Sequence, residues 1–285
     1  MKVLVFGASG QVGQELRKFN NVVALSRSAA DLTDPRSCVA HIATTNADAI
    51  INAAAYTAVD RAEEDEATAT LVNSHAVGIM AQAAAQRRLP FLHISTDYVF
   101  DGHGNDPRSP SDPTAPLNAY GRSKLAGEQA IQDTGARHII LRTSWVFSAH
   151  GSNFVKTMLR LSESHDHLRV VNDQIGGPTS AADIATALMV IASQMKTTDH
   201  PGGTYHFSGT PAVSWAEFAK EIFSQVERDI TVTGIPSVDY PTPAPRPLNS
   251  RLSCESLYED FGISMPDWRE GLAAVLKESK STKAL

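Results

Sequence analysis

The sequence predicts an α/β protein: a doubly wound parallel sheet with helices on both faces, and a smaller lobe at the C-terminal end. Two patterns carry this prediction. Short apolar runs alternate with helical spacing through the first half of the chain. The runs VLVF, VVAL and IIL are apolar without interruption, which is typical of parallel strands that are buried on both faces.

The strands of this sheet are expected where the apolar runs lie, at residues 3–6, 22–25, 49–52, 91–94 and 138–141. Helical spacing follows the first run up to Phe19. Two longer helices are expected between the later strands, because small residues and good helix formers dominate there. One runs from about Asp60 to Arg87, and the other surrounds residues 118–128.

The pattern changes after Trp145 and predicts the smaller lobe. Helices are expected at residues 153–161 and from Ala182 onward, with a strand at residues 168–171. The polar and proline-rich stretches should be loops and the tail should be frayed: residues 196–203, 236–249 and 278–285. We therefore expect a first domain over residues 1–150, to which parts of 172–206 return, and a lobe made mainly of residues 151–285.

Composition excludes several classes of protein. The chain has 285 residues with 42% hydrophobic and 20% charged residues, as in an ordinary globular protein. Its net charge of −6 and the lack of a dense basic run argue against a nucleic-acid partner. No apolar stretch approaches the ~20 residues that span a bilayer, so no membrane partner is expected. Two isolated cysteines and no signal-peptide pattern favour a cytoplasmic location.

The stretch GASGQVG, residues 7–13, follows the first expected strand and opens a helix. Gly7 permits a tight turn, Gly10 lets a pyrophosphate approach the backbone, and Gly13 lets the helix pack on the sheet. The backbone N–H groups at the start of that helix are suited to phosphates. The first domain is therefore expected to be a Rossmann-type dinucleotide-binding domain, and this turn predicts cofactor contacts from Ser9, Gln11 and Val12 as well.

The end of the second strand indicates which nicotinamide cofactor binds. An acid there would hold the ribose 2′-hydroxyl of NADH, but the chain has Ser26 and Arg27. Arginine is well suited to phosphate, so NADPH is favoured over NADH, although Arg27 could equally be a solvated surface residue. Asp31 and Leu32 are candidates for the adenine edge and ring, with a helix-capping turn as the alternative.

Tyr120 and Lys124 are four positions apart in NAYGRSKLAGE, and so share one face of a helix. A nearby positive charge stabilises a phenolate, so we expect Lys124 and an oxidised nicotinamide together to lower the pKa of Tyr120 and to make it a proton donor and acceptor. Thr96 follows a strand at the carboxyl end of the sheet, where its hydroxyl can orient a substrate carbonyl. Together with the glycine turn, these residues indicate a carbonyl reductase that uses a nicotinamide cofactor.

At this point the sequence resembles the extended short-chain dehydrogenase/reductases and, more narrowly, the dTDP-4-dehydrorhamnose reductase family. The resemblance covers nearly the whole chain. It rests on GASGQVG, NAAAYTAVDRAE, STDYVFDG, PLNAYGRSKLAGE, LRTSWVF, NFVKTMLRL, NDQIGGPT and PRPLNSRLS.

The resemblance implies reduction of the C4 ketone of dTDP-4-dehydro-6-deoxy-L-mannose to dTDP-L-rhamnose, with Thr96, Tyr120 and Lys124 as catalytic residues. It also implies cofactor contacts, by Lys124 and Tyr120 again and by Ala53, Ala54, Ala55, Tyr56 and Thr143. Substrate contacts would come from Thr57, Val59, Thr96, Asp97, Tyr98, Tyr120, Trp145 and Arg246. Arg246 would contact the diphosphate. An equally good alternative is that Arg246 is an ordinary surface arginine beside a rigid loop.

The chain departs from the family in one respect. Some members form a dimer through magnesium bound by glutamates, and Glu15 is present here. The other acids are expected where this chain has Ala182 and Arg269, and Asp183 and Glu270 are offset by one position. Bound Mg2+ is therefore disfavoured, no protein metal ligand is assigned, and a monomer or weak homodimer is expected.

Two other functions remain open at this level. The family resembles a regulatory subunit of methionine adenosyltransferase, which binds a nucleotide without catalysis; the intact Thr96, Tyr120 and Lys124 argue against it. A nucleotide-sugar epimerase or dehydratase of the same fold is the other alternative. A dehydratase would have a second acid after Asp97, where this chain has Tyr98.

Overall fold

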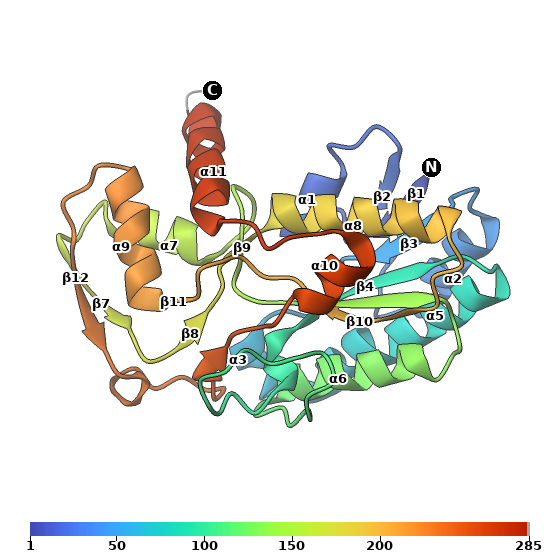
Figure 1. Cartoon of the computed structure of the whole chain (residues 1–285), viewed down its shortest axis with the longest axis horizontal. Helices are drawn as coiled ribbons and strands as arrows, with labels where there is room; N and C mark the ends of the chain where they lie inside the picture. Colours follow the sequence, from blue (N-terminus) through green and yellow to red (C-terminus); the bar gives the residue numbers. More distant parts are fainter. Residues whose placement is uncertain (284–285) are drawn as a thin grey trace.

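The computed structural model describes residues 1–283, with side chains up to residue 279. Its centre is a six-stranded parallel sheet (Figure 1). In spatial order the strands are β10 (Gly202–His206), β5 (His138–Thr143), β4 (Phe91–Thr96), β3 (Ala49–Asn52), β1 (Val3–Phe6) and β2 (Val22–Leu25). The strand order reverses between the neighbouring strands β1 and β3, so the sheet is doubly wound, as predicted.

Both faces of the sheet are buried because alternate residues of each strand point to opposite sides. Val3 and Val5 pack under α1 (Gln11–Leu16) and α8 (Ala181–Thr197), whereas Leu4 and Phe6 pack against α2 (Pro35–Thr44) and α5 (Ala76–Gln86). Figure 1 shows α1 and α8 on one side of the sheet and α5 and α6 (Ala119–Gln132) on the other. This two-sided core explains the uninterrupted apolar runs.

The helix expected from Asp60 to Arg87 is wrong as a single element. It consists of α3 (Val59–Ala62), α4 (Glu66–Thr70), the π-helical turn η1 (Leu71–His75) and α5. Within η1, both polar atoms of the Asn73 side-chain amide bond to other segments. Oδ1 accepts from the Tyr56 backbone N–H, and Nδ2 donates to the Ser123 hydroxyl. The wider turn thus carries a buried polar side chain toward the segment after β3.

The stretch 196–203 is only partly a loop, because α8 continues to Thr197 and β10 begins at Gly202. Gly202 and Gly203 open this edge strand, and glycines are typical of loops, so the sequence pattern does not indicate a strand here. A Cβ at Gly202, which has φ +93°, would collide with the His138 carbonyl oxygen of the neighbouring strand. Close approach between the backbones of β10 and β5 therefore requires glycine at this position.

The smaller lobe has its own apolar core. It is formed by α7 (Phe154–Leu161), β7 (His167–Val171), α9 (Trp215–Gln225) and α11 (Trp268–Lys283). Strand β12 (Thr231–Ile235) pairs with β7, and β8 (Ile175–Gly176) pairs with β11 (Val213–Ser214) and β13 (Asn249–Ser250). β6 (Val146–Phe147) pairs with β9 (Thr179–Ser180), and α10 (Glu255–Phe261) returns to the main domain beside α8 and β10.

Two loop predictions fall in this lobe. The proline-rich stretch 236–249 is irregular apart from the turn η3 (Ser237–Asp239) and the first residue of β13, so the prediction of a loop is confirmed there. The prediction of a frayed tail is wrong up to Lys283, because α11 continues to that residue. Residues 284–285 lie outside the described part of the chain. Among the described residues, no helix is long and apolar enough to cross a membrane.

Candidate active site

The glycine turn lies between β1 and α1, with backbone that requires two of its glycines. Gly7 has φ +95°, and a Cβ there would lie 2.6 Å from the Ala54 backbone nitrogen. A Cβ at Gly13 would collide with the Gly7 carbonyl oxygen. Gly10 is exposed, and the nearest atom to a Cβ there would be 3.4 Å away. The turn is therefore closed on its sheet side, and Gly10 leaves its outer side accessible to a phosphate.

The start of α1 is tied to the second lobe. The Gln11 carbonyl oxygen Oε1 accepts hydrogen bonds of 2.9 Å from the Ser148 hydroxyl and from Asn153 Nδ2. Ser9, just before, is exposed and Val12 is buried in the core. Of the residues predicted for this turn, Ser9 and Gly10 lie at the surface, whereas Val12 contributes to packing.

The residues after β2 lie at the edge of the sheet. Arg27 Nε lies 3.1 Å from Asp31 Oδ2, and the Arg27 side chain is 76% exposed. A hydrogen bond from the Thr33 backbone holds the pKa of Asp31 below its ordinary value, so its carboxylate is charged beside Arg27. Leu32 is buried in the core with Phe6, so its side chain is not exposed for packing on an adenine ring. Arg27 is thus accessible to a ligand, but it already has an acidic partner.

Two buried hydroxyls lie unpaired where the nicotinamide cofactor is expected. The Tyr56 phenol, after β3, and the Thr143 hydroxyl, at the end of β5, have no hydrogen-bond partner among the described residues. Ala53, Ala54 and Ala55 before them are partly buried. Buried hydroxyls normally find a partner, so this end of the sheet offers polar contacts suited to a bound polar ligand.

The start of α6 is fixed by three hydrogen bonds. Asn118 Oδ1 caps the helix by accepting from the Gly121 backbone at 2.8 Å, and Asn118 Nδ2 donates to the Pro245 carbonyl at 2.8 Å. Glu63 Oε1 accepts from the Ala119 backbone at 2.7 Å. Tyr120 is the next residue, so these contacts with α3 and the proline-rich loop determine the position of its phenol.

Tyr120 meets Thr96 and Asp97 at the carboxyl end of β4. Burial, together with the charge of Asp97, raises the pKa of Tyr120, and a hydrogen bond with Thr96 opposes this rise. Burial also raises the pKa of Asp97 to about 6. The Tyr98 ring packs edge-on against Tyr120, with the centroids 5.6 Å apart. The groups of the chain therefore keep the phenol protonated, opposite to the expected lowering of its pKa.

Lys124 turns toward the sheet. Its Nζ lies 2.7 Å from the Ile94 carbonyl oxygen and 2.9 Å from His93 Nε2. Its side chain is buried, and burial lowers the pKa of Lys124 to about 8, which the charge of Glu128 opposes. Sequence reasoning missed His93. A histidine two residues before the conspicuous STD stretch, on a strand next to the expected helix, was the available signal.

Trp145 follows β5 and packs against two elements of the smaller lobe. Its ring stacks on Trp215 with the centroids 3.5 Å apart and an angle of 8°. The indole also lies close to the β8 backbone, because a Cβ at Gly176 would be 2.8 Å from it. Trp145 has φ 50°, a left-handed conformation that costs ~1–3 kcal/mol in a non-glycine residue. This predicted substrate contact is therefore held in place by packing, and Trp215 was not foreseen.

Arg246 pairs with an acid on the other side of the site. Its Nη1 and Nη2 donate to the two oxygens of Asp60 at 2.9 and 2.8 Å, and the Ala244 backbone donates to the same carboxylate. Thr57, near Asp60 in the sequence, is exposed, and Val59 is partly buried. This ion pair joins the proline-rich loop to α3, so Arg246 lies at the boundary of the two lobes.

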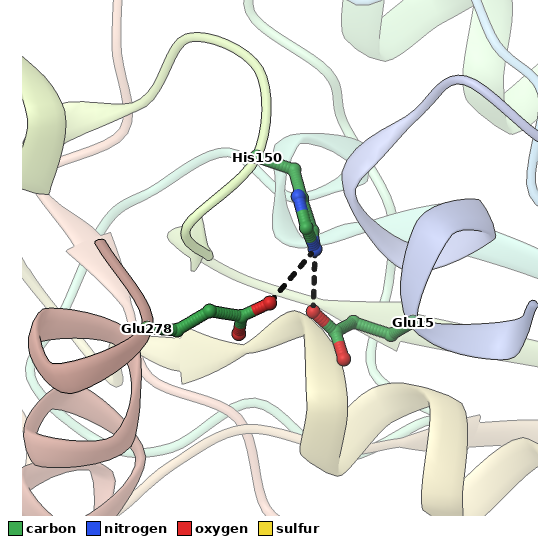
Figure 2. A group of neighbouring side chains, drawn as sticks. All are labelled: Glu15, His150 and Glu278. Atoms are coloured by element: carbon green, nitrogen blue, oxygen red, sulfur yellow. Dashed lines mark ion pairs between the residues drawn. The ribbon is translucent and has the colours of Figure 1, made fainter. Parts of the chain in front are cut away.

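Glu15, His150 and Glu278 come together away from Tyr120, from α1, the loop after β6 and α11 (Figure 2). His150 Nε2 lies 3.1 Å from Glu15 and 3.7 Å from Glu278. The Lys18 ammonium lies 2.8 and 3.1 Å from the same two carboxylates. Mg2+ prefers six oxygen ligands, whereas this group offers an imidazole and already holds a cation. The residues therefore fit Mg2+ poorly.

Glu278 corrects one detail of the sequence reading. The resemblance implies an acid just after Trp268, where this chain has Arg269. The acid that meets Glu15 is Glu278, farther along α11, because the helix passes α1 only near its C-terminal end.

Comparisons with known proteins identify the family. The family model of the RmlD substrate binding domain matches residues 1–281. A dTDP-4-dehydrorhamnose reductase from Sinorhizobium fredii is 45% identical in an alignment 280 residues long, which covers 95% of this chain and 95% of the relative. Solved structures of dTDP-4-dehydrorhamnose reductases from Clostridium acetobutylicum and, with NADP, from Bacillus anthracis are each 35% identical. Each covers 98% of this chain and 100% of its own, with TM-scores of 0.91 and 0.90. The chain belongs to the dTDP-4-dehydrorhamnose reductase family.

Proposed function

We propose that the chain reduces the C4 ketone of dTDP-4-dehydro-6-deoxy-L-mannose, with NADPH as hydride donor, and so makes dTDP-L-rhamnose. The observation that carries this proposal is the meeting of Thr96 and Tyr120 at the carboxyl end of β4, with Lys124 on the same helix as Tyr120. The family to which the chain belongs supports the choice of substrate, and the relative from Bacillus anthracis was solved with NADP.

Tyr120 supplies the proton. Its raised pKa keeps the phenol protonated at neutral pH, which is the form that can donate to the carbonyl oxygen. Donation leaves a phenolate, which must be stabilised. A positive charge on Lys124 would favour that phenolate. The Thr96 hydroxyl has one hydrogen, which Asp97 Oδ1 accepts at 3.1 Å. We propose that this hydrogen turns to the carbonyl oxygen, and so orients it, when the sugar is bound.

NADPH supplies the hydride when it is bound. We assign its phosphates to the glycine turn and its 2′-phosphate to Ser26 and Arg27, the latter being exposed. The unpaired hydroxyls of Tyr56 and Thr143 support contacts at the nicotinamide end. The remaining proposed contacts are Gly7, Ser9, Gly10, Gln11, Val12, Gly13, Asp31, Leu32, Ala53, Ala54, Ala55, Tyr120 and Lys124. Among these, Leu32 is the weakest assignment, because its side chain is buried in the core.

The dTDP-sugar is assigned to the opening between the lobes. We propose that Trp145 packs on the sugar, that Arg246 exchanges Asp60 for the diphosphate, and that Thr57 and Val59 complete this side. Asp97 and Tyr98 would contact the sugar beside Tyr120. A guanidinium group can bind a phosphate through two parallel hydrogen bonds, in the same bidentate way as Arg246 binds the Asp60 carboxylate.

We propose a monomer or weak homodimer without a bridging metal, since the Lys18 ammonium already pairs with the carboxylates of Glu15 and Glu278. We also propose a reducing, cytoplasmic setting. Both cysteines, Cys38 and Cys254, are free and buried, which supports it.

The test is to supply the dTDP-4-keto sugar and follow the absorbance of reduced nicotinamide with NADPH and NADH in turn. We expect oxidation of the cofactor and formation of dTDP-L-rhamnose, faster at low concentrations of NADPH than of NADH. No oxidation with either cofactor would overturn the proposal in favour of a regulatory, nucleotide-binding relative. Release of water from a sugar without net oxidation of NADPH would favour a dehydratase.

A further inference from the structure

Three buried polar side chains form a continuous row from β3 through β4 to α6. They are Asn52 at the end of β3, His93 on β4 and Lys124 on α6, with exposed fractions of 0%, 0% and 1%. Asn52 Nδ2 lies 3.1 Å from His93 Nδ1, and His93 Nε2 lies 2.9 Å from Lys124 Nζ. None of these contacts reaches solvent, so each hydrogen in the row must have a defined position.

The direction of the row is determined at Asn52. Its Oδ1 accepts a hydrogen bond of 3.1 Å from the Ala54 backbone N–H, so its NH2 group faces His93 Nδ1. The reversed amide would place NH2 against that N–H, two donors facing each other in the protein interior. His93 Nδ1 must therefore accept. A neutral imidazole with an accepting Nδ1 carries its proton on Nε2.

The Nε2–H of His93 then points at Lys124. An ammonium has three donors and no lone pair, so it would oppose this N–H at 2.9 Å. An amine has one lone pair and two hydrogens. The lone pair can accept from Nε2–H, and one hydrogen can go to the Ile94 carbonyl oxygen at 2.7 Å. Only the neutral amine satisfies every group in the row.

We propose that His93, oriented by Asn52, is a positioning residue that favours the neutral amine of Lys124 over its ammonium and so makes the lysine easier to deprotonate. Protonation, –NH2 plus H+ to –NH3+, breaks the contact with Nε2–H. For turnover, the inference rests on the proposed function, because only the ammonium stabilises the Tyr120 phenolate.

The electrostatics of the row agree with its geometry. Burial, and the charge of Lys124 when it is protonated, lower the pKa of His93 well below its ordinary value, so the imidazole stays neutral in both states of the lysine. Burial lowers the pKa of Lys124 to about 8, so the amine prevails above that pH. The acid that acts on it, Glu128 on α6, is itself paired with Arg142 of β5 at 2.6 Å.

The direct test is the tautomer of His93. In the full chain, labelled with 15N-histidine and without added nucleotide, two-bond 1H–15N spectra at pH 9, where the amine of Lys124 prevails, should show His93 protonated on Nε2. Asn52→Asp should switch the proton to Nδ1, because a carboxylate only accepts. A wild-type His93 protonated on Nδ1, or on both nitrogens, would overturn the proposal. The signal is assigned with His93→Phe, which keeps a ring beside Phe91.

The second test is the pH profile of kcat/KM. We expect wild-type activity to fall as the pH rises above about 8, where Lys124 loses its proton. His93→Phe removes the N–H that favours the amine, so this fall should move about one unit higher in pH. If the fall in kcat/KM moves to lower pH instead, His93 accepts from an ammonium. If the fall stays at the same pH while the rate drops, the role of His93 is purely structural. Either result overturns the proposal. Absence of any reductase activity would instead overturn the proposed function and leave the tautomer result intact.

Discussion

The two sides of the candidate site hold their side chains by different interactions. On the sheet side, Lys124 and Tyr120 are positioned by hydrogen bonds of buried groups, such as those of His93 and Asn118. On the lobe side, Trp145 is held by ring stacking, with the Trp215 centroid 3.5 Å away. Hydrogen bonds define direction, which proton transfer requires, whereas stacking defines a surface, which suits the recognition of a sugar.

The charged pairs of the two sides differ in the same way. Glu128 and Arg142, on the sheet side, are 2% and 5% exposed. Asp60 and Arg246, which join the lobes, are 42% and 24% exposed. Water can replace a partner in the second pair but not in the first. We therefore expect substitutions on the sheet side to have larger effects on turnover and stability than substitutions on the lobe side.

The largest expected effect is on turnover. Tyr120→Phe removes the proton donor while leaving the ring to pack against Tyr98, so kcat should fall by roughly 10²–10⁴-fold. NADPH should still bind within a few-fold of its wild-type affinity, measured by fluorescence titration. A variant that keeps near-full turnover would show that another group donates the proton.

The next largest effect is on stability. Arg142→Met leaves Glu128 charged and buried, so the free energy of unfolding should fall by ~3–5 kcal/mol in urea denaturation. Arg142→Met combined with Glu128→Leu should recover most of this loss, because no charge is then stranded. On the lobe side, Asp60→Asn should cost less than ~1 kcal/mol. Equal losses for the two single variants would remove the distinction between the sides.

The pH dependence of stability tests Lys124 itself. Its pKa in the fold, about 8, lies below its ordinary 10.5, so between these values the unfolded chain binds more protons than the folded one. The contribution of Lys124 to stability should therefore rise from pH 8 to pH 10.5, by ~3 kcal/mol. Lys124→Met should lack this rise, which is measured as the difference between the two urea curves at each pH. Parallel curves would show that Lys124 titrates normally.

Much of the sheet side could be predicted from the sequence. Strand runs such as VLVF are read from apolar pattern, and Gly7 and Gly13 are read from the turn that they make possible. Helical spacing also places Tyr120 and Lys124 on one face. It does not say which way the ammonium turns, because that depends on His93, which a neighbouring strand brings beneath the helix. Local pattern therefore found the residues, but it does not show the burial and the Asp97 charge that raise the pKa of Tyr120 in the chain without cofactor.

The lobe side was less predictable for a physical reason. Trp145 was found as a candidate, but its partner Trp215 lies on a different helix and reaches it only through packing of the lobe. Arg246 likewise meets Asp60 across 186 positions of the chain. Contacts between distant segments leave no periodic signal in one sequence, so neither partner could be inferred.

Loss of the Trp145–Trp215 ring stack should have a smaller effect on catalysis. Trp215→Ala frees one face of Trp145, so KM for the dTDP-sugar should rise about tenfold while kcat changes little. Trp215→Phe keeps an aromatic ring and should stay within about threefold of wild type. Near-ultraviolet circular dichroism reports on the paired indoles, and its loss without any change in KM would mean that Trp145 does not face the substrate.

The smallest expected effect concerns the edge of the sheet. Arg27 is 76% exposed, so its interaction with a 2′-phosphate is weakened by solvent and partly opposed by the neighbouring Asp31 carboxylate. Arg27→Ala should weaken NADPH binding by about fivefold and leave NADH binding nearly unchanged, as measured by titration with each cofactor. Added salt should reduce the difference, because exposed charges are screened. If both cofactors lose affinity equally, Arg27 acts only on the backbone of the turn, and the preference for NADPH must come from Ser26 or from residues beyond β2.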